Sequence, residues 1–250
     1  MPSHITSSRL AHTAVAVLAT GLLLSGCSLD DTEQKKAAAD ATVGEAVTAV
    51  EVKDARSGSI EVTPGTGPGV TVHRTVHYRG DTEPKPGQQV SGGVLTFTDG
   101  CTDTCYIDYR LEVPASATVK LGSSSGNVTV TGVAAADLAS SSGNVKAEGI
   151  AGPLKVHTSS GSVTATGLDG PTAQVHSSSG DARLTFTKPP TSVTAETSSG
   201  NVTLSVPQAP YRITTATDSG KQDILPSTPA ATSHVSVQTS SGDIRIAAGA

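Results

Sequence analysis

A Ser-Gly dipeptide recurs through the second half of the chain and restricts the fold more than any other feature. Successive glycines are separated by 17, 18, 19, 20, 20 and 22 residues. They are Gly126, Gly143, Gly161, Gly180, Gly200, Gly220 and Gly242. Repeats of this length predict a solenoid or another stacked array, in which each unit chiefly contacts its neighbours.

Apolar residues alternate with polar ones on both sides of each glycine. In the unit of Gly161 they are Leu154 and Val156 before the turn, and Val163 and Ala165 after it. An alternation of period two predicts two short strands per unit, each with one buried face. We therefore predict an all-β fold, a β-solenoid of two-strand coils stacked about 4.8 Å apart.

The turn itself has a constant composition. A Ser or Thr three residues before the glycine is expected to face inward and to hydrogen bond from one rung to the next. These residues are Ser123, Ser140, Thr158, Ser177, Thr197, Thr217 and Thr239. The glycine is expected to supply a positive φ, and the Asn or Asp after it to bond its own backbone. The unit of Gly220 has Thr215 and Gln222 in apolar positions, so the weakest packing is expected there.

Upstream of the repeats the strands are longer and share no period. Ser57-Gly58 is a degenerate copy of the turn. We predict one domain over residues 49–250, in which residues 49–114 form an irregular N-terminal cap and residues 115–250 form the Ser-Gly repeats, because solenoids need an atypical terminal unit.

The N-terminus has the pattern of a lipoprotein signal peptide. An apolar stretch ends in Leu24-Ser25-Gly26-Cys27, which resembles a bacterial lipobox. We predict that residues 1–26 are removed and that Cys27 is acylated, with the membrane as a partner and the extracytoplasmic face of the bacterial cell membrane as the location. The alternative is an ordinary signal peptide with a chance cysteine. Residues 27–48 are polar at their start and are expected to form a flexible tether.

Two further cysteines lie four residues apart. In an oxidising compartment Cys101 and Cys105 are expected to form a disulfide. A redox pair or half of a zinc site are the alternatives, although the spacing is not the CxxC of either.

Charge and composition exclude some binding functions. The net charge of −5, without a Lys/Arg cluster, argues against nucleic acid as a partner. The chain has no Trp, two Phe and four Tyr, which disfavours sugar binding on aromatic platforms. No cofactor is predicted.

One column of the predicted solenoid could hold a metal ion. His157, His176 and Glu196 are expected on adjacent rungs of one exposed face, and such side chains bind transition metals. A solvated polar face is the interpretation we favour, because no supporting residues are evident. His73 and His77 similarly share one face of a strand.

The predicted register offers no pattern of catalytic residues. No outward column places two acids on neighbouring rungs, and the chain lacks the GxSxG turn of serine hydrolases. The sequence therefore predicts a protein that is not an enzyme.

The strand Tyr109-Arg-Leu-Glu-Val-Pro114, followed by Ser-Ser-Gly-Asn/Asp-Val units, resembles the bacterial "putative adhesin" family of β-strand repeat proteins, a domain of unknown function. The resemblance covers residues 49–250 and includes the cysteine pair before that strand. It implies a β-solenoid in the cell envelope and supplies no catalytic residues.

These observations together favour a non-catalytic, lipid-anchored cell-surface module that contacts an envelope polymer or a surface protein. The first alternative is an accessory or sensor lipoprotein of an envelope-stress or transport system. The second is a polysaccharide-active enzyme.

Overall fold

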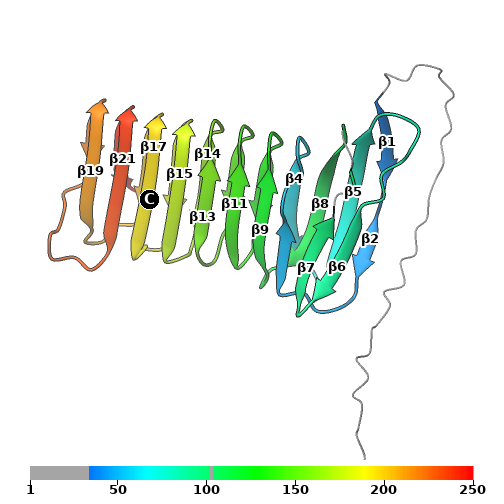
Figure 1. The fold of residues 1–250 in the computed structure, drawn as a ribbon. Coiled ribbons are helices and arrows are strands. Elements are labelled where there is room, and N and C mark those ends of the chain that lie inside the picture. Colours follow the sequence, from blue (N-terminus) through cyan, green and yellow to red (C-terminus); the bar gives the residue numbers. More distant parts are fainter. Residues whose placement is uncertain (1–33, 99, 102–103, 250) are drawn as a thin grey trace, which may run out of the picture.

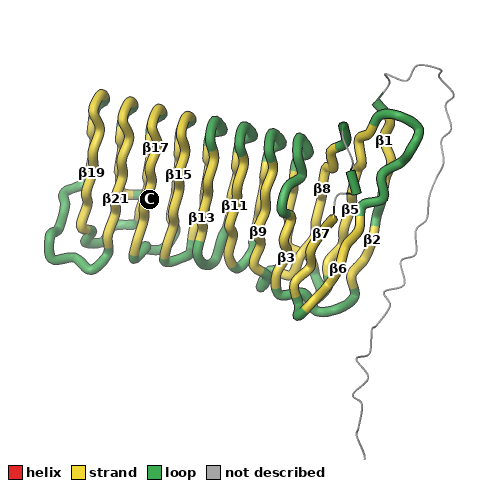
Figure 2. The backbone as a smooth tube through the Cα atoms, viewed as in Figure 1, coloured by secondary structure: helices red, strands yellow, loops and turns green. Residues whose placement is uncertain are grey.

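The protein is an elongated stack of strands, and its computed structural model describes residues 34–98, 100–101 and 104–249 (Figure 1). These residues form 22 strands joined by turns and loops (Figure 2). No helix among them is long and apolar enough to cross a membrane. The predicted all-β class is confirmed.

The strands form two sheets that share the interior of the stack. The first sheet, in spatial order, contains β1 (Lys35–Ala38) and β2 (Ala41–Val43), both beside β5 (Val70–Tyr78), then β8 (Tyr106–Pro114), β4 (Ile60–Gly65), β10 (Val128–Thr131), β12 (Val145–Glu148), β14 (Val163–Leu168), β16 (Ala182–Phe186), β18 (Val202–Val206), β22 (Ile244–Ala248) and β20 (Gln222–Ile224). The second contains β6 (Gly87–Ser91), β7 (Val94–Thr98), β3 (Ala49–Val52), β9 (Thr118–Ser123), β11 (Ala135–Ser140), β13 (Leu154–Thr158), β15 (Thr172–Ser179), β17 (Ser192–Ser199), β21 (His234–Ser241) and β19 (Arg212–Ser219).

Each Ser-Gly unit is one rung, with one strand in each sheet. Equivalent residues of neighbouring rungs pair in parallel register, as Val145 does with Val163 and Leu154 with Ala173. The alternating apolar side chains fill the space between the sheets, and Val156 and Val163 are each 1 % exposed. The predicted stacking and the predicted buried face are confirmed, because only stacking can cover the apolar face of such short coils.

The order of the rungs departs from the order of the chain at the C-terminal end. The last unit, β21 and β22, lies between the rung of β17 and β18 and the rung of β19 and β20. The rung of Gly220 is thus the end of the stack, and both of its strands are largely exposed. The weak packing predicted there is confirmed. An apolar rung in the interior and a polar rung against water bury more hydrocarbon than the reverse order would.

The cap shows a similar reversal. The rung of β3 and β4 lies between β7 and β8 on one side and β9 and β10 on the other. Ile60 pairs with Val128 and Val62 with Val130, so the degenerate turn at Gly58 does begin a rung of the solenoid. Antiparallel pairing is confined to the cap strands β1, β2, β5, β6, β7 and β8 among the strands described.

The prediction that residues 27–48 form a flexible tether is wrong from Lys35 onward. Strands β1 and β2 pair antiparallel with β5, and Val43 is buried against the cap. The buried Arg74 guanidinium donates from Nε to the Ala39 carbonyl oxygen at 3.0 Å, and burial lowers its pKa. The short apolar alternation that ends at Val43 carries enough buried surface to hold this segment on the sheet. Cys27 and residues 1–33 lie outside the described residues.

Candidate functional site: corners and outer faces of the stack

The glycines of the fixed corner stack directly on one another. A Cβ added to Gly143 would lie 1.9 Å from the carbonyl oxygen of Gly126, and the same close approach recurs at every corner glycine of the repeat. The expected positive φ is not the shared reason, since Gly126, Gly143, Gly161 and Gly220 lack one. Glycine is required because the backbone of the neighbouring rung occupies the place of a side chain.

Most of the inward hydroxyls bond to backbone groups rather than to each other, whereas the buried Ser177 Oγ has no hydrogen-bond partner in the described part of the chain. Ser140 Oγ accepts the Gly143 N–H at 2.9 Å and donates to the carbonyl oxygen of Gly126 at 3.4 Å. The Thr239 hydroxyl likewise donates to the Gly200 carbonyl oxygen at 3.1 Å. The expected link between rungs exists, but it runs from a hydroxyl to a backbone carbonyl of the next rung.

The residue after each glycine forms a second ladder. Asn127 Oδ1 accepts the backbone N–H of Asn144 at 2.9 Å, and Asn144 Oδ1 accepts that of Ser162 at 3.0 Å. The ladder resumes at Asp181, whose Oδ1 accepts the Asn201 N–H at 2.8 Å. The expectation that these side chains bond their own backbone is wrong, because the neighbouring rung brings a free N–H within reach.

The histidine column lies where the sequence placed it, on the outer face of the second sheet. His157 pairs with His176, and His176 with Glu196. The two imidazole rings are parallel with centroids 5.1 Å apart, and His176 Nδ1 lies 3.4 Å from Glu196 Oε2. Among residues 34–98, 100–101 and 104–249, no three His, Cys, Asp or Glu side chains could hold a metal ion.

The other two candidate histidines do not act together. His73 is exposed, with Nδ1 3.3 Å from Asp40 Oδ1. His77 is buried, stacks on the Tyr106 ring at 4.4 Å, and places Nε2 2.8 Å from Asp108 Oδ2. His77 therefore joins two cap strands, β5 and β8.

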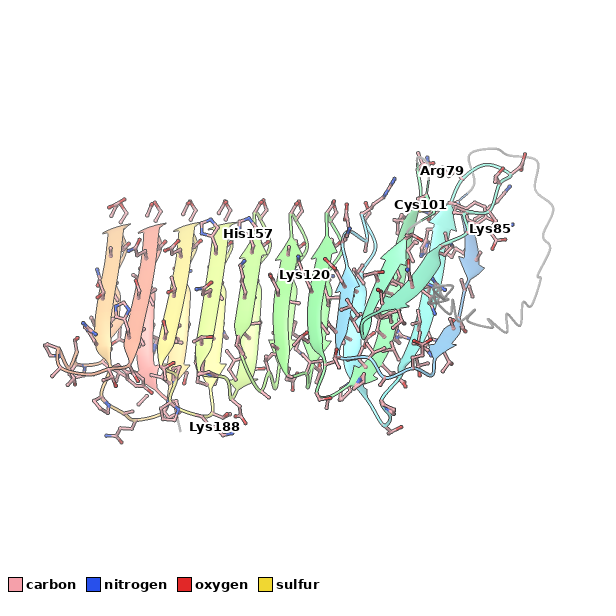
Figure 3. The ribbon with its side chains drawn as sticks, turned by 60° about the horizontal axis from the view of Figure 1, so that its bottom comes forward. Arg79, Lys85, Cys101, Lys120, His157 and Lys188 are labelled. Atoms are coloured by element: carbon pink, nitrogen blue, oxygen red, sulfur yellow. A yellow bond between two sulfur atoms is a disulfide. The ribbon has the colours of Figure 1, made fainter. Side chains whose placement is uncertain are left out.

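Cys101 and Cys105 form the disulfide predicted from their spacing, with their Cα atoms 5.5 Å apart. Arg56 Nη2 donates to the Cys101 carbonyl oxygen at 3.4 Å, so the bridge lies against the loop that follows β3. The bridge is labelled at Cys101 on the cap in Figure 3.

The outer face of the second sheet has neighbouring charges of opposite sign. Lys120 Nζ lies 3.5 Å from Glu51 Oε1, and Lys155 Nζ lies 3.9 Å from Asp137 Oδ2. Each pair joins neighbouring rungs. Each of these two lysines is thus neutralised by a carboxylate on the neighbouring rung.

The outer face of the first sheet also pairs opposite charges on neighbouring rungs, as Arg245 with Asp223, and it has a further feature that was missed in the sequence. An open groove of about 590 Å³ crosses it from β14 to β20. Its floor includes Thr164 and Thr203, and Arg183 and Arg245 project from alternate rungs beside them. These threonines and arginines all stand three residues after a corner glycine, so the sequence contains the column. Which of them are neighbours could be known only from the order of the rungs in the structure.

The carboxylates of this groove are engaged. Asp181 Oδ1 accepts the Asn201 N–H, and Asp243 Oδ1 accepts the Lys221 N–H, both at 2.8 Å. Asp223 Oδ2 lies 3.7 Å from Arg245 Nε. The groove can therefore present fixed polar groups to a ligand, whereas its acids are held by the protein itself.

The model of the family described as Toastrack DUF4097 matches residues 46–247. The chain belongs to the Toastrack family. This agrees with the resemblance seen in the sequence, and the match begins three residues before the expected start of the domain. No curated protein matches this Toastrack chain.

Three solved structures are similar to this Toastrack chain. A "putative adhesin" from Bacteroides fragilis NCTC 9343 has a TM-score of 0.50 at 13% identity, covering 86% of this chain and 97% of that one. A "putative adhesin" from Parabacteroides distasonis ATCC 8503 has 0.42 at 12%, covering 84% and 97%. A "putative cell adhesion protein" from Clostridium sporogenes ATCC 15579 has 0.34 at 11%, covering 87% and 100%. The Bacteroides structure supports the shared fold.

Proposed function

We propose that this chain is a non-catalytic binding rod of the bacterial cell surface, anchored through an acylated Cys27. The observation that carries the proposal is the open polar groove over β14 to β20, at the end of the stack opposite β1. Its volume of about 590 Å³ lies within the range of ligand sites in proteins. The description of the Bacteroides fragilis protein, whose fold is similar, as a "putative adhesin" agrees with this function.

The short distance from Cys27 to the first strand supports the orientation of the rod. Only residues 28–34 separate that cysteine from Lys35 in β1. A fully extended chain of that length reaches about 28 Å. With Cys27 acylated, the cap would therefore lie near the membrane and the groove at the far end of the rod, where it can meet an envelope polymer or a surface protein.

The engaged carboxylates make catalysis a weaker proposal. A glycoside hydrolase needs one carboxyl group free to give a proton and another free to act as base or nucleophile. In the groove, Asp181, Asp223 and Asp243 each have an oxygen bound by a backbone N–H or an arginine. Recognition of a polar surface uses such fixed groups directly.

Fractionation of producing cells tests the anchor. The wild-type chain is expected in the membrane fraction with incorporated palmitate, and the Cys27→Ser chain in the medium without it. A wild-type chain that is released as freely as Cys27→Ser would contradict the anchor.

Co-sedimentation tests binding. The full Cys27→Ser chain is expected to sediment with isolated cell envelopes in a saturable manner, and to release no reducing ends from wall glycans. Absence of sedimentation would overturn the binding function. Release of reducing ends would instead favour the enzyme. Sedimentation abolished by protease treatment of the envelopes would show that the partner is a surface protein and not an envelope polymer.

A further inference from the structure

From β12 to β22, long basic side chains occupy every second rung on the outer face of the first sheet, in a column that continues to Glu61 at one end and Asp223 at the other. Pairing in register gives the column order Thr129, Lys146, Thr164, Arg183, Thr203 and Arg245. The three basic residues are exposed, and the threonines between them are half-buried. We call Lys146, Arg183 and Arg245 the cation row. It runs along the axis of the stack, across the strands.

The spacing of the cation row follows from the fold. Neighbouring strands lie about 4.8 Å apart, so residues two rungs apart are separated by about 9.6 Å. This distance is close to the length of one extended disaccharide unit. A linear polysaccharide with one carboxylate per disaccharide could therefore place successive carboxylates beside successive members of the row. The half-buried threonines leave room for the sugar between them.

The central member of the row is the best placed to bind an anion. Lys146 Nζ lies 3.2 Å from Glu148 Oε2, and Arg245 Nε lies 3.7 Å from Asp223 Oδ2. Within the described part of the chain, Arg183 makes no ion pair, although it lines the groove. A guanidinium in this position can hold a carboxylate through two parallel hydrogen bonds.

The acids of the groove limit how much negative charge a bound polymer can carry. Asp181, Asp223 and Asp243 also line the groove, so its formal charge is balanced by Arg183, Arg245 and Lys221. Asp181 and Asp243 lie on the same rungs as Arg183 and Arg245, and Asp223 pairs with Arg245, so these acids oppose every carboxylate beyond those that the arginines bind. A sparse polyanion brings fewer such carboxylates than a polymer with an anion on every unit. Balanced charge of this kind gives selectivity by repulsion as well as attraction.

We propose that the groove and the cation row bind a linear acidic polysaccharide that carries one uronate per disaccharide, lying along the axis of the stack. This inference rests on the proposed binding function and names its ligand class. Arg183 would hold one carboxylate and Arg245 the next through its Nη groups, while Arg245 Nε stays beside Asp223. The hydroxyls of Thr164 and Thr203 would bond the intervening sugar.

Binding of defined polymers to the full Cys27→Ser chain tests this proposal by calorimetry. The probes are hyaluronan oligosaccharides, polygalacturonate, dextran and single-stranded DNA. Hyaluronan, with one carboxylate per disaccharide, is expected to bind more tightly than the other three and to weaken as sodium chloride is raised. Arg183→Gln is expected to weaken hyaluronan binding by roughly tenfold, the loss of one charge-assisted bidentate contact.

Lys155→Gln is the matched control, because it removes an exposed cation from the outer face of the other sheet. It should bind hyaluronan as the unsubstituted chain does, and both variants should keep the thermal unfolding midpoint. Equal binding of dextran or DNA, or unchanged hyaluronan binding by Arg183→Gln, would overturn the inference. If hyaluronan does not bind while cell envelopes still do, the ligand class is wrong and the binding function stands.

Discussion

Thr215 Oγ1 donates a hydrogen bond to Gln222 Oε1 over 2.6 Å, between the two strands of the last rung. In the neighbouring rung the residues in register with them are the buried Val237 and Ile244. A polar pair thus replaces an apolar pair where the stack meets water. Its bond satisfies both groups and leaves little hydrocarbon exposed at the open end.

The polar pair is expected to prevent end-to-end association. Replacing it by Thr215→Val with Gln222→Leu would expose an apolar surface beside Ile224, which is already 41% exposed. We expect the double variant to form dimers or larger species as its concentration rises, measured by sedimentation velocity. Thr214→Val, on the exposed face of the same strand, is the control and should stay as the unsubstituted chain. A double variant that remains monomeric throughout would contradict this role.

Because the corner glycines stack closely, adding one methyl group at a corner is expected to lower the stability of the fold strongly. In Gly143→Ala the new Cβ meets the backbone of Gly126, and neither rung can move without opening the ladder between them. We expect a loss of unfolding free energy of about 2 kcal/mol or more in denaturant titrations. Gly44→Ala is the control, since a Cβ there meets no atom within 4 Å. Equal stability of the two variants would refute the steric explanation.

The buried face of the central rungs predicts opposite effects at adjacent positions. Val202 is fully buried and Thr203 faces the groove. Val202→Asp would bury an unpaired charge, and we expect loss of the cooperative thermal transition. Thr203→Asp should leave the transition within a few degrees of its normal midpoint. An unchanged midpoint for Val202→Asp would show that the inside and outside faces are assigned wrongly. An unchanged midpoint for a charged residue at Val163 would show the same.

The loop carboxylate Asp169 gives a prediction of pH dependence. A hydrogen bond from the Thr187 hydroxyl, followed by one from Lys188 Nζ at 2.9 Å, holds its pKa below the ordinary value of 3.8. Because the folded pKa is the lower one, this interaction stabilises the fold fully above the ordinary value and is lost as pH falls through the folded pKa. Figure 3 labels Lys188 at this edge of the stack.

Thr187→Val and Lys188→Gln are each expected to raise the pKa of Asp169 toward 3.8, as followed by NMR titration of the carboxyl carbon. Thr172→Val, in the neighbouring strand β15, is the control and should leave that titration unchanged. An unchanged titration of Asp169 in Thr187→Val would contradict the assigned leading cause.

The sequence by itself determined the repeating part of the fold. An alternation of period two with one apolar face leaves a single register, because a shift by one residue would turn Val163 and its equivalents toward water. The column of His157, His176 and Glu196 could therefore be placed correctly from spacing alone.

Only the tertiary structure decided the order of the rungs at both ends, the docking of β1 and β2, and the neighbours of each outward side chain. Parallel rungs have the same backbone geometry, so the local sequence does not determine which rung lies next to the rung of Val202. That choice depends on the total apolar surface covered when β22, rather than β20, lies against β18. Arg245 is placed two rungs from Arg183 by the same choice, and the cation row therefore arises from long-range packing.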